Sequence, residues 1–293
     1  MASHLSEETI TSRENKWLKI FRAALRGTGP TEGEPIGVEG PKLVEDALRS
    51  GLEAEALLVS EAGEADLDRI LRAASESEAG IPRSRVMRTT EKLFASVAGT
   101  ETPQGVAALF RQRAWEFDDV VRGAARADGA LRGDAALVVV MAAVQDPGNI
   151  GTIVRSAEAF GATGVVTTRG SADPWSPKAL RASAGSGLRF PILRGMAIPV
   201  LLAQLRVAGV KIVAASSHSA GVSGAGADLR EAVAIFIGNE GAGLPREIEH
   251  VADARISIPM SAGVESLNAG VAASVVLYEA ARQRKGITAD KHR

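Results

Sequence analysis

The stretch that decides the fold runs from Leu137 to Thr168 and reads LVVVMAAVQDPGNIGTIVRSAEAFGATGVVTT. It begins with Leu137–Val144, a continuous apolar run rich in β-branched residues, which is typical of a strand buried on both faces of a parallel sheet. A turn at Gln145–Asn149 follows, and then a helix that ends at Gly161 and a second strand at Gly164–Thr168. The stretch therefore predicts a β-α-β unit, the building block of a parallel α/β sheet.

The rest of the chain adds elements on both sides of this unit. After it, the sequence predicts strands at Val210–Ala214, Val233–Ile237 and Ile256–Pro259 and a closing helix at Asn268–Arg284. Before it, the sequence predicts a smaller α/β unit with helices at Thr9–Leu25, Pro41–Ser50, Ala65–Ala74 and Thr90–Ala95 and strands at Ile36–Val38, Ala56–Ser60 and Val106–Phe110. We therefore expect two domains, residues 1–110 and 135–293, joined by a charged, alanine-rich helical linker at residues 111–134.

Length and composition exclude several classes of protein. The chain has 293 residues, of which 45% are hydrophobic and 24% are charged, which is ordinary for a globular protein. Its longest apolar run, Ala135–Val144, is far shorter than the roughly 20 residues that cross a bilayer, and the N-terminus lacks an apolar signal core. Because there is no cysteine and the four histidines lack metal-ligand spacing, we expect no disulfide and no metal site, and we expect a cytoplasmic location without membrane contact.

The charge is distributed unevenly, although its sum is only −1. Residues 1–134 carry 18 Lys and Arg against 23 Asp and Glu, whereas residues 135–293 carry 16 against 12, so the back half attracts a polyanion more strongly. Two local clusters of basic residues could attract a polyanion or could equally be solvated helix faces. They are Arg13, Lys16, Lys19, Arg22 and Arg26, and then Arg83, Arg85, Arg88 and Lys92. A third set is a candidate track for phosphates: Lys178, Arg181, Arg189 and Arg194.

The turn Gln145–Asn149 is the first of three loops that could carry function. Proline and glycine fix a tight turn, and the side chains of Asp146 and Asn149 can cap the helix that follows. The N-terminus of that helix suits an anion, and Arg155 lies less than two turns into it among apolar neighbours. Taken alone, Arg155 could be an ordinary exposed arginine; otherwise its guanidinium reaches a bound oxyanion.

Two further loops follow buried strands. Gly238–Leu244 contains three glycines, which let the backbone approach a ligand closely. It matches neither the G-x-G-x-x-G fingerprint nor a Walker A loop, so simple nucleotide-phosphate binding is disfavoured. The last loop joins Ile258–Met260 to Ser266–Asn268, where Ser266 is the expected N-cap of a closing helix rich in small residues.

Together, the three loops resemble the motifs of the SpoU/TrmH family of RNA 2′-O-ribose methyltransferases, within the SPOUT superfamily. The family motifs N-x-G-T-x-x-R, G-x-E-x-x-G-L and I-P-M with S-L-N correspond to Asn149–Arg155, Gly238–Leu244, Ile258–Met260 and Ser266–Asn268. This likeness covers roughly residues 135–285. The front part is similar to the ribosomal-protein L30e-like substrate-binding domain that often accompanies such enzymes, in VEGPKLVEDAL (Val38–Leu48) and TPQGVAAL (Thr102–Leu109).

The resemblance implies a SPOUT-type α/β fold whose parallel sheet ends in a C-terminal trefoil knot, preceded by the smaller L30e-like domain. It implies S-adenosylmethionine as the cofactor, bent in the knot and held at Gly238, Ile258 and Leu267, with the loop SSHSAG after Ala215 on its other side. It further implies a homodimer with RNA sites across the interface. The expected partner is RNA, with ribosomal RNA favoured over transfer RNA.

The same resemblance assigns the critical catalytic role to Arg155. A guanidinium stays protonated in proteins and is therefore a poor base, so we favour Arg155 as a clamp on the target phosphate that makes the ribose hydroxyl more acidic. Asn149 and Asn268 would then orient the ribose, and Glu240 and Ser266 would support the loops by hydrogen bonding. Glu240 could instead do no more than pin its own glycine loop.

One departure and several alternatives remain open. The family usually reads S-L-N-V-S where this chain has Ala269-Gly270 after the asparagine, which puts an RNA contact by the second serine in doubt and leaves cofactor binding intact. A transfer-RNA 2′-O-methyltransferase and a non-catalytic RNA-binding module are alternatives, although intact Arg155, Glu240 and Asn268 argue against the second. An oxidoreductase on a Rossmann-like sheet and a seven-stranded Rossmann methyltransferase would each need a glycine-rich loop that the sequence lacks.

Overall fold

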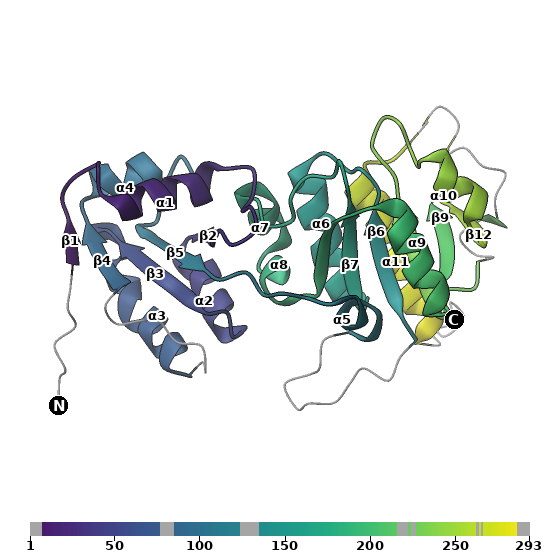
Figure 1. The fold of residues 1–293 in the computed structure, drawn as a ribbon, viewed down its shortest axis with the longest axis horizontal. Coiled ribbons are helices and arrows are strands. Elements are labelled where there is room, and N and C mark those ends of the chain that lie inside the picture. The colour runs from purple at the N-terminus through teal and green to yellow at the C-terminus, as the bar shows by residue number, and fades with distance from the viewer. Residues whose placement is uncertain are drawn as a thin grey trace. The chain divides into compact units, whose positions relative to one another are not determined.

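The structure is a computed structural model that describes residues 8–76, 85–123, 135–215, 222–223, 227–261, 264 and 266–285. The chain folds into two compact units. The first lies within Met1–Ala114 together with Trp175–Arg189, and the second within Trp115–Pro174 together with Phe190–Arg293. Each unit is a sheet covered by helices (Figure 1).

The first unit is built on a five-stranded mixed sheet with the order β1-β4-β3-β5-β2. Its strands are β1 (Glu8–Ile10), β2 (Ile36–Glu39), β3 (Ala54–Val59), β4 (Val86–Thr89) and β5 (Val106–Phe110). β4 runs parallel to β1 and β3, whereas β5 runs antiparallel to β3 and β2. The sequence did not predict β1 and β4, because strands this short contain too few residues to show an alternating pattern.

The described helices of the first unit are α1 (Lys16–Arg26), α2 (Pro41–Arg49), the 3-10 turn η1 (Glu61–Gly63), α3 (Glu64–Glu76), α4 (Glu91–Val97), α7 (Pro177–Ser183) and α8 (Ser186–Arg189). Three of them, α1, α4 and α7, begin at a residue whose side chain caps them. The helix expected at Thr9–Leu25 begins later than predicted, because its first residues pair with β4 as a strand. The Asn15 side chain then caps α1 by accepting from the Trp17 amide at 2.8 Å.

Two arginines of the basic cluster on α1 serve the fold. Arg22 Nε donates to the carbonyl oxygen of Ser96 at 3.3 Å, and Arg26 Nε donates to that of Ala98 at 2.7 Å. Carbonyls at the end of a helix lack partners within the helix and carry partial negative charge, and these two lie at the end of α4. The arginines therefore tie α1 to α4. In the second basic cluster, Arg83 lies outside the described residues.

The second unit is built on a seven-stranded, wholly parallel sheet with the order β10-β12-β9-β11-β6-β7-β8. Its strands are β6 (Leu137–Met141), β7 (Gly164–Thr168), β8 (Ile192–Met196), β9 (Lys211–Ala215), β10 (Val222–Ser223), β11 (Val233–Ile237) and β12 (Ala254–Ser257). β6, β7 and β11 are buried along their whole length, and for β6 the continuous apolar run predicted this burial. The expected parallel α/β sheet is thus confirmed. The sequence did not predict β8, the strand at one edge of the sheet.

The helices of the second unit surround this sheet (Figure 1). They are α5 (Phe117–Arg122), α6 (Pro147–Ala159), α9 (Ile198–Val207), α10 (Arg246–Val251) and α11 (Ala269–Arg284). Asp146 caps α6 by accepting from the Gly148 amide at 3.2 Å, as predicted, whereas Asn149, the other expected cap, lies inside the helix. α11 packs on α6, where the hydroxyls of Ser156 and Ser274 lie 2.7 Å apart. None of the described helices combines the length and apolar character that a membrane span requires.

Two segments do not pack where the expected domain boundaries place them. Trp175–Arg189 lies within residues 135–293 but packs with the first unit, and Trp175 Nε1 closes this segment by donating to the Gly187 carbonyl at 2.9 Å. α5 lies within the expected linker, residues 111–134, but packs in the second unit. Residues 124–134 lie outside the described part of the chain. The functional division into substrate-binding and methyltransferase domains stays a prediction.

Candidate active site

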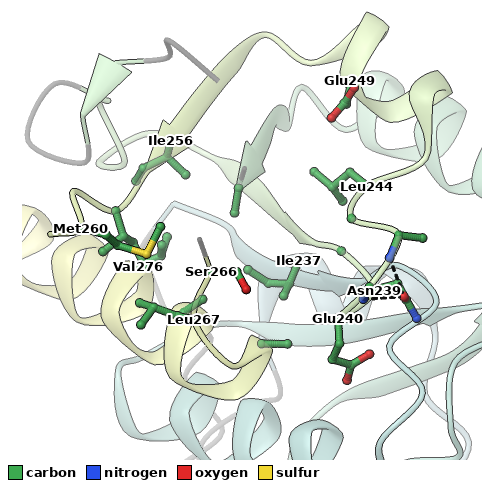
Figure 2. A pocket seen from close by; sticks show the side chains of 18 residues that line it. Ile237, Asn239, Glu240, Leu244, Glu249, Ile256, Met260, Ser266, Leu267 and Val276 are labelled. Carbon is green, nitrogen blue, oxygen red and sulfur yellow. Dashed lines mark hydrogen bonds between the residues drawn. The ribbon is translucent and has the colours of Figure 1, made fainter. Parts of the chain in front are cut away.

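A cavity of about 590 Å³ lies at the carboxyl ends of β9, β11 and β12 (Figure 2). Ligands of parallel α/β sheets bind at this edge. Its walls also include the glycine loop Gly238–Leu244 and the start of α11. The large apolar side chains that line it are Ile237, Leu244, Ile256, Ile258, Met260 and Leu267. The cavity therefore offers an apolar surface next to exposed loop backbone.

Asn239 holds the glycine loop Gly238–Leu244 in a closed turn. Asn239 and Gly243 exchange two backbone hydrogen bonds of 3.0 Å, and Asn239 Oδ1 accepts from the amides of Gly241 and Ala242 at 2.9 Å each. Gly238 has no room for a side chain, because a Cβ there would lie 2.4 Å from the carbonyl carbon of Gly243. Asn239 was not among the residues predicted from the sequence, although an asparagine that starts a glycine-rich turn is a signal for this local hydrogen bonding.

Three side chains, from the first turn of α6, the glycine loop and the N-cap of α11, form one hydrogen-bonded relay, which we call the amide relay: Asn149, Glu240 and Asn268. Asn149 Nδ2 donates to Glu240 Oε1 at 2.7 Å, and Asn268 Nδ2 donates to Asn149 Oδ1 at 2.9 Å. Asn268 Oδ1 accepts from the amides of Gly270 and Val271 at the start of α11. Because a carboxylate only accepts and helix amides only donate, both asparagine side chains have a fixed orientation.

The three positions expected at the cofactor, Gly238, Ile258 and Leu267, all line the cavity. Ser266 lines it as well, but the prediction that it caps the closing helix is wrong: the N-cap of α11 is Asn268. An asparagine cap leaves the serine hydroxyl outside the helix, on the cavity wall. The loop SSHSAG, expected on the other side of the cofactor, lies outside the described residues.

Arg155 lies on the exposed side of α6. The buried side of this helix includes Ile153, Val154 and Ala157, so the arginine faces away from the core. No hydrogen bond or ion pair within the described chain engages its guanidinium, and it lies outside the cavity lining. The structure thus brings the amide relay and the cavity together and leaves Arg155 available to an anion that arrives with a substrate.

The surroundings of Glu240 lower the pKa of its carboxyl below the ordinary value. Burial raises the pKa, but the hydrogen bond from Asn149 and those from the backbone amides of Glu240, Gln145 and Asp146 lower it by more. The fold therefore favours the ionised form. Because the folded-state pKa is lowered, the resulting stabilisation is present above the unfolded-state pKa and is lost as the pH falls through the folded-state pKa.

The departure at Ala269-Gly270 lies where α11 meets α6. A Cβ at Gly270 would lie 3.1 Å from Thr152 Cγ2, which is tighter than ordinary van der Waals contact. The Thr152 hydroxyl is itself held, because it donates to the Gly148 carbonyl at 2.9 Å. A serine at this position would require Thr152 to move. The glycine therefore allows a close approach of the two helices that carry the first and third motifs.

Family profiles and a curated relative match nearly the whole chain. Residues 136–278 match the SpoU rRNA Methylase family, and residues 32–108 match the MRM3-like substrate binding domain. The chain is 31% identical over 270 residues to the 23S rRNA (guanosine(2553)-2′-O)-methyltransferase RlmP of Bacillus subtilis. That alignment covers 92% of this chain and 97% of the relative.

Solved structures share the fold over a similar length. The crystal structure of an AdoMet-bound rRNA methyltransferase from Sinorhizobium meliloti has a TM-score of 0.79 at 30% identity and covers 96% of this chain and 99% of that one. The SpoU methyltransferase AviRb from Streptomyces viridochromogenes, solved in complex with AdoMet, has a TM-score of 0.77 at 27% identity and covers 93% of this chain and 99% of that one. The likeness extends over both units.

Proposed function

Because this chain belongs to the SpoU rRNA Methylase family, we propose that it transfers a methyl group from S-adenosylmethionine to a ribose 2′-hydroxyl of ribosomal RNA. The observation that carries this proposal is the amide relay beside the cavity. It joins the first turn of α6, the glycine loop and the N-cap of α11, which belong to the three sequence motifs. A non-catalytic RNA-binding module would have no need of such an ordered arrangement next to a ligand-sized cavity.

The cavity fits S-adenosylmethionine in size and chemistry. Small-ligand cavities measure about 300–1,000 Å³, and this one measures about 590 Å³. The apolar side chains suit an adenine ring, and the glycine loop offers backbone amides and carbonyls. We place Gly238, Ile258 and Leu267 against the cofactor. When bound, S-adenosylmethionine would supply a methyl group activated by its sulfonium, and the sulfur would leave as a neutral thioether.

The protein's own task is to position and activate the ribose hydroxyl. In our proposal, Arg155 binds the phosphate of the target nucleotide, and its positive charge stabilises the developing alkoxide. A phosphate oxygen or a water molecule takes the proton. Asn149 and Asn268 each use one side-chain N–H in the relay, so a second N–H of each is available to orient the ribose. Glu240 holds Asn149, and Ser266 faces the same cavity.

We expect the substitution Glu240→Gln to lower kcat by about tenfold or more. A glutamine can still accept from Asn149, but its amide nitrogen would then face the backbone amides of Gln145 and Asp146, which also donate. Turnover is measured at saturating S-adenosylmethionine and RNA. The control is Glu247→Gln, an exposed acid on α10, which should turn over like the wild type. Equal turnover of the two variants would remove the relay from the catalytic account.

The proposal includes a homodimer that pairs through α11. Three apolar side chains of this helix are exposed at a spacing of one and two turns: Val271 (49%), Val275 (42%) and Tyr278 (57%). Residues at this spacing form one stripe along a helix. An exposed apolar stripe on a folded unit is typical of a protein interface. Phe160 at the end of α6 extends it, since its ring meets that of Tyr278 edge to face at 5.9 Å.

The variant Val275→Glu is expected to weaken dimerisation by at least about a hundredfold, because a charge would be buried at the interface. The measurement is the molar mass in solution over a concentration series, by light scattering or sedimentation. Val207→Glu is the control: Val207 is 91% exposed on α9, away from the stripe, and should leave the mass unchanged. A monomeric wild type, or a dimer that survives Val275→Glu, would contradict pairing through α11.

The choice of ribosomal over transfer RNA rests on the RlmP relative, whose name assigns it to 23S rRNA. The candidate phosphate track gives less support than the sequence suggested. Arg194 is paired with Asp173 at 2.7 Å, and the remaining track residues lie in the first unit. We therefore assign substrate binding mainly to the first unit, as the match to a substrate binding domain supports. The trefoil knot and the cytoplasmic location belong to the same proposal.

Two experiments test the proposed function. In calorimetry, S-adenosylmethionine should bind the purified protein and NAD should not; the opposite result would favour an oxidoreductase. Mapping of 2′-O-methylation in ribosomal and transfer RNA from a strain that lacks this protein should then reveal one missing methyl group in ribosomal RNA. A methyl group missing from transfer RNA alone would support the alternative substrate.

A further inference from the structure

The structure strains the backbone at one residue next to the proposed active site. Ala143, two residues after the end of β6, has a φ of 56°. This left-handed conformation is uncommon for a residue that has a Cβ. Such residues persist only where their surroundings enforce the conformation, and they are concentrated at functional sites. The conformation of Ala143 must therefore be held by its contacts.

Two hydrogen bonds fix the peptide groups on either side of Ala143. Its amide donates to Thr168 Oγ1 at 3.1 Å, and its carbonyl accepts from Asn239 Nδ2 at 2.9 Å. Thr168 is the last residue of β7 and is only 1% exposed. The hydrogen bond from the Ala143 amide fixes the plane of the peptide group before this residue. The hydrogen bond to the Ala143 carbonyl fixes the plane of the peptide group after it. Together they hold both backbone dihedrals of Ala143.

The chain that leaves Ala143 leads directly into the turn before α6. The Val144 carbonyl accepts from the Ala172 amide at 2.9 Å, and the Gln145 amide reaches Glu240 Oε2 at 3.4 Å. Asp146 then caps α6, whose first turn contains Asn149. A change of φ at Ala143 would swing this turn away from Glu240. The amide relay therefore depends on the conformation of a residue that does not belong to it.

We propose that Ala143, Thr168 and Asn239 form a positioning joint that holds the turn before α6 against the glycine loop. Asn239 acts from the cavity side, where its Oδ1 also closes the glycine loop. Thr168 acts from the far side and does not line the cavity. Both are positioning residues, because they act through Ala143 on the amide relay. The effect of the joint on turnover rests on the proposed function, but its effect on the turn does not.

Thr168→Val tests the joint from the side away from the cavity. It removes the acceptor of the Ala143 amide at nearly constant volume, and we expect kcat to fall by about tenfold or more, since small displacements of reacting groups reduce rates strongly. The Michaelis constant for S-adenosylmethionine should change little. Thr168→Ser keeps the hydroxyl and should restore turnover. A wild-type kcat in Thr168→Val would overturn the proposal.

Thr163→Val is the matched control for lost stability. Thr163 lies directly before the first residue of β7, at the end opposite Thr168, and is 2% exposed. Its hydroxyl accepts from the Leu137 amide and donates to the Leu137 carbonyl, both at 3.2 Å. Its loss should lower the unfolding midpoint in urea about as much as Thr168→Val and leave the kcat of the folded protein unchanged. An equal loss of kcat in both valine variants would show a general effect of stability and would overturn the joint.

Substitutions at Ala143 test the same idea even if Thr168→Val fails to fold. Glycine adopts the left-handed conformation without strain, so Ala143→Gly should keep kcat within about twofold. Valine is β-branched and adopts this conformation with more difficulty than alanine, so Ala143→Val should lose about tenfold or more in kcat. If the glycine and valine variants turn over equally, the φ of this residue does not control the site.

Hydrogen exchange gives a readout that needs neither RNA nor turnover. Exchange at the amides of residues 144–152 should accelerate in Thr168→Val and Ala143→Val and stay slow in Ala143→Gly and Thr163→Val. Unchanged exchange in all four variants would overturn the joint. If the exchange pattern holds but no RNA is methylated by the wild type, the joint stands and the proposed function fails.

Discussion

Replacing Arg155 with Ala is expected to lower turnover by at least about a hundredfold. Its guanidinium is exposed on α6 and has no partner within the described chain, so its removal should leave the fold intact. It also lies outside the cavity lining, so the dissociation constant for S-adenosylmethionine should stay within about threefold of the wild-type value. The measurements are single-turnover methyl transfer to RNA and calorimetry with the cofactor.

Two further variants make the Arg155 experiment specific. Arg206→Ala removes another exposed arginine, in the last turn of α9, and should retain wild-type turnover. Arg155→Lys keeps the charge but loses the planar fork that binds phosphate through two hydrogen bonds, so it should recover only part of the activity. If Arg155→Ala still turns over normally, the proposed phosphate clamp is wrong.

Gly238→Ala should lower the affinity for S-adenosylmethionine by at least about tenfold, because the glycine loop could no longer close. The added Cβ would lie 2.4 Å from the carbonyl carbon of Gly243 and 2.6 Å from the amide nitrogen of Leu244. Both are backbone atoms of the cavity wall, so they can move only if the loop opens. The affinity is measured by calorimetry with S-adenosylmethionine and with its demethylated product.

Gly241→Ala is the matched control within the same loop. A Cβ at Gly241 would lie 3.7 Å from Asn239 Oδ1, which is ordinary van der Waals contact. This variant should bind the cofactor with nearly wild-type affinity. If Gly238→Ala also binds normally, the loop is more pliable than its hydrogen bonds indicate, and the cofactor does not depend on its closed form.

The sequence predicted the centre of each sheet much better than its edges. β5, β7 and β11 lie at the residues expected for them, because a strand buried on both faces is a run of apolar and β-branched residues. β1 and β8 are edge strands that were missed, and α1 begins well after Thr9 because the preceding residues pair with β4. The packing of Trp175–Arg189 with the first unit depends on tertiary contacts, which local sequence patterns do not encode.

For the candidate site, the motifs contain the residues of the amide relay but did not show how these residues meet. Glu240 was expected to support the loops by hydrogen bonding or to pin its own glycine loop, and it accepts a hydrogen bond from Asn149, 91 positions away in the chain. Asn268 reaches Asn149 across 119 positions. Separations of this size depend on the whole fold, so no local pattern could have shown the relay. The hydrogen bond from Asn239 to the Ala143 carbonyl, across 96 positions, and the strain at Ala143 were missed for the same reason.

The measurement that tests the central claim most directly is the chemical position of the transferred methyl group. Ribosomal RNA that lacks the modification is incubated with the protein and S-adenosylmethionine labelled in the methyl group, and the RNA is then hydrolysed in alkali. Alkali cleaves RNA through the free 2′-hydroxyl, so a 2′-O-methylated linkage survives. We predict that the label appears in alkali-resistant dinucleotides and is absent when Arg155 is replaced with Ala. Label recovered in mononucleotides would mean that a base is methylated, and it would contradict a site built to present a ribose oxygen to the cofactor.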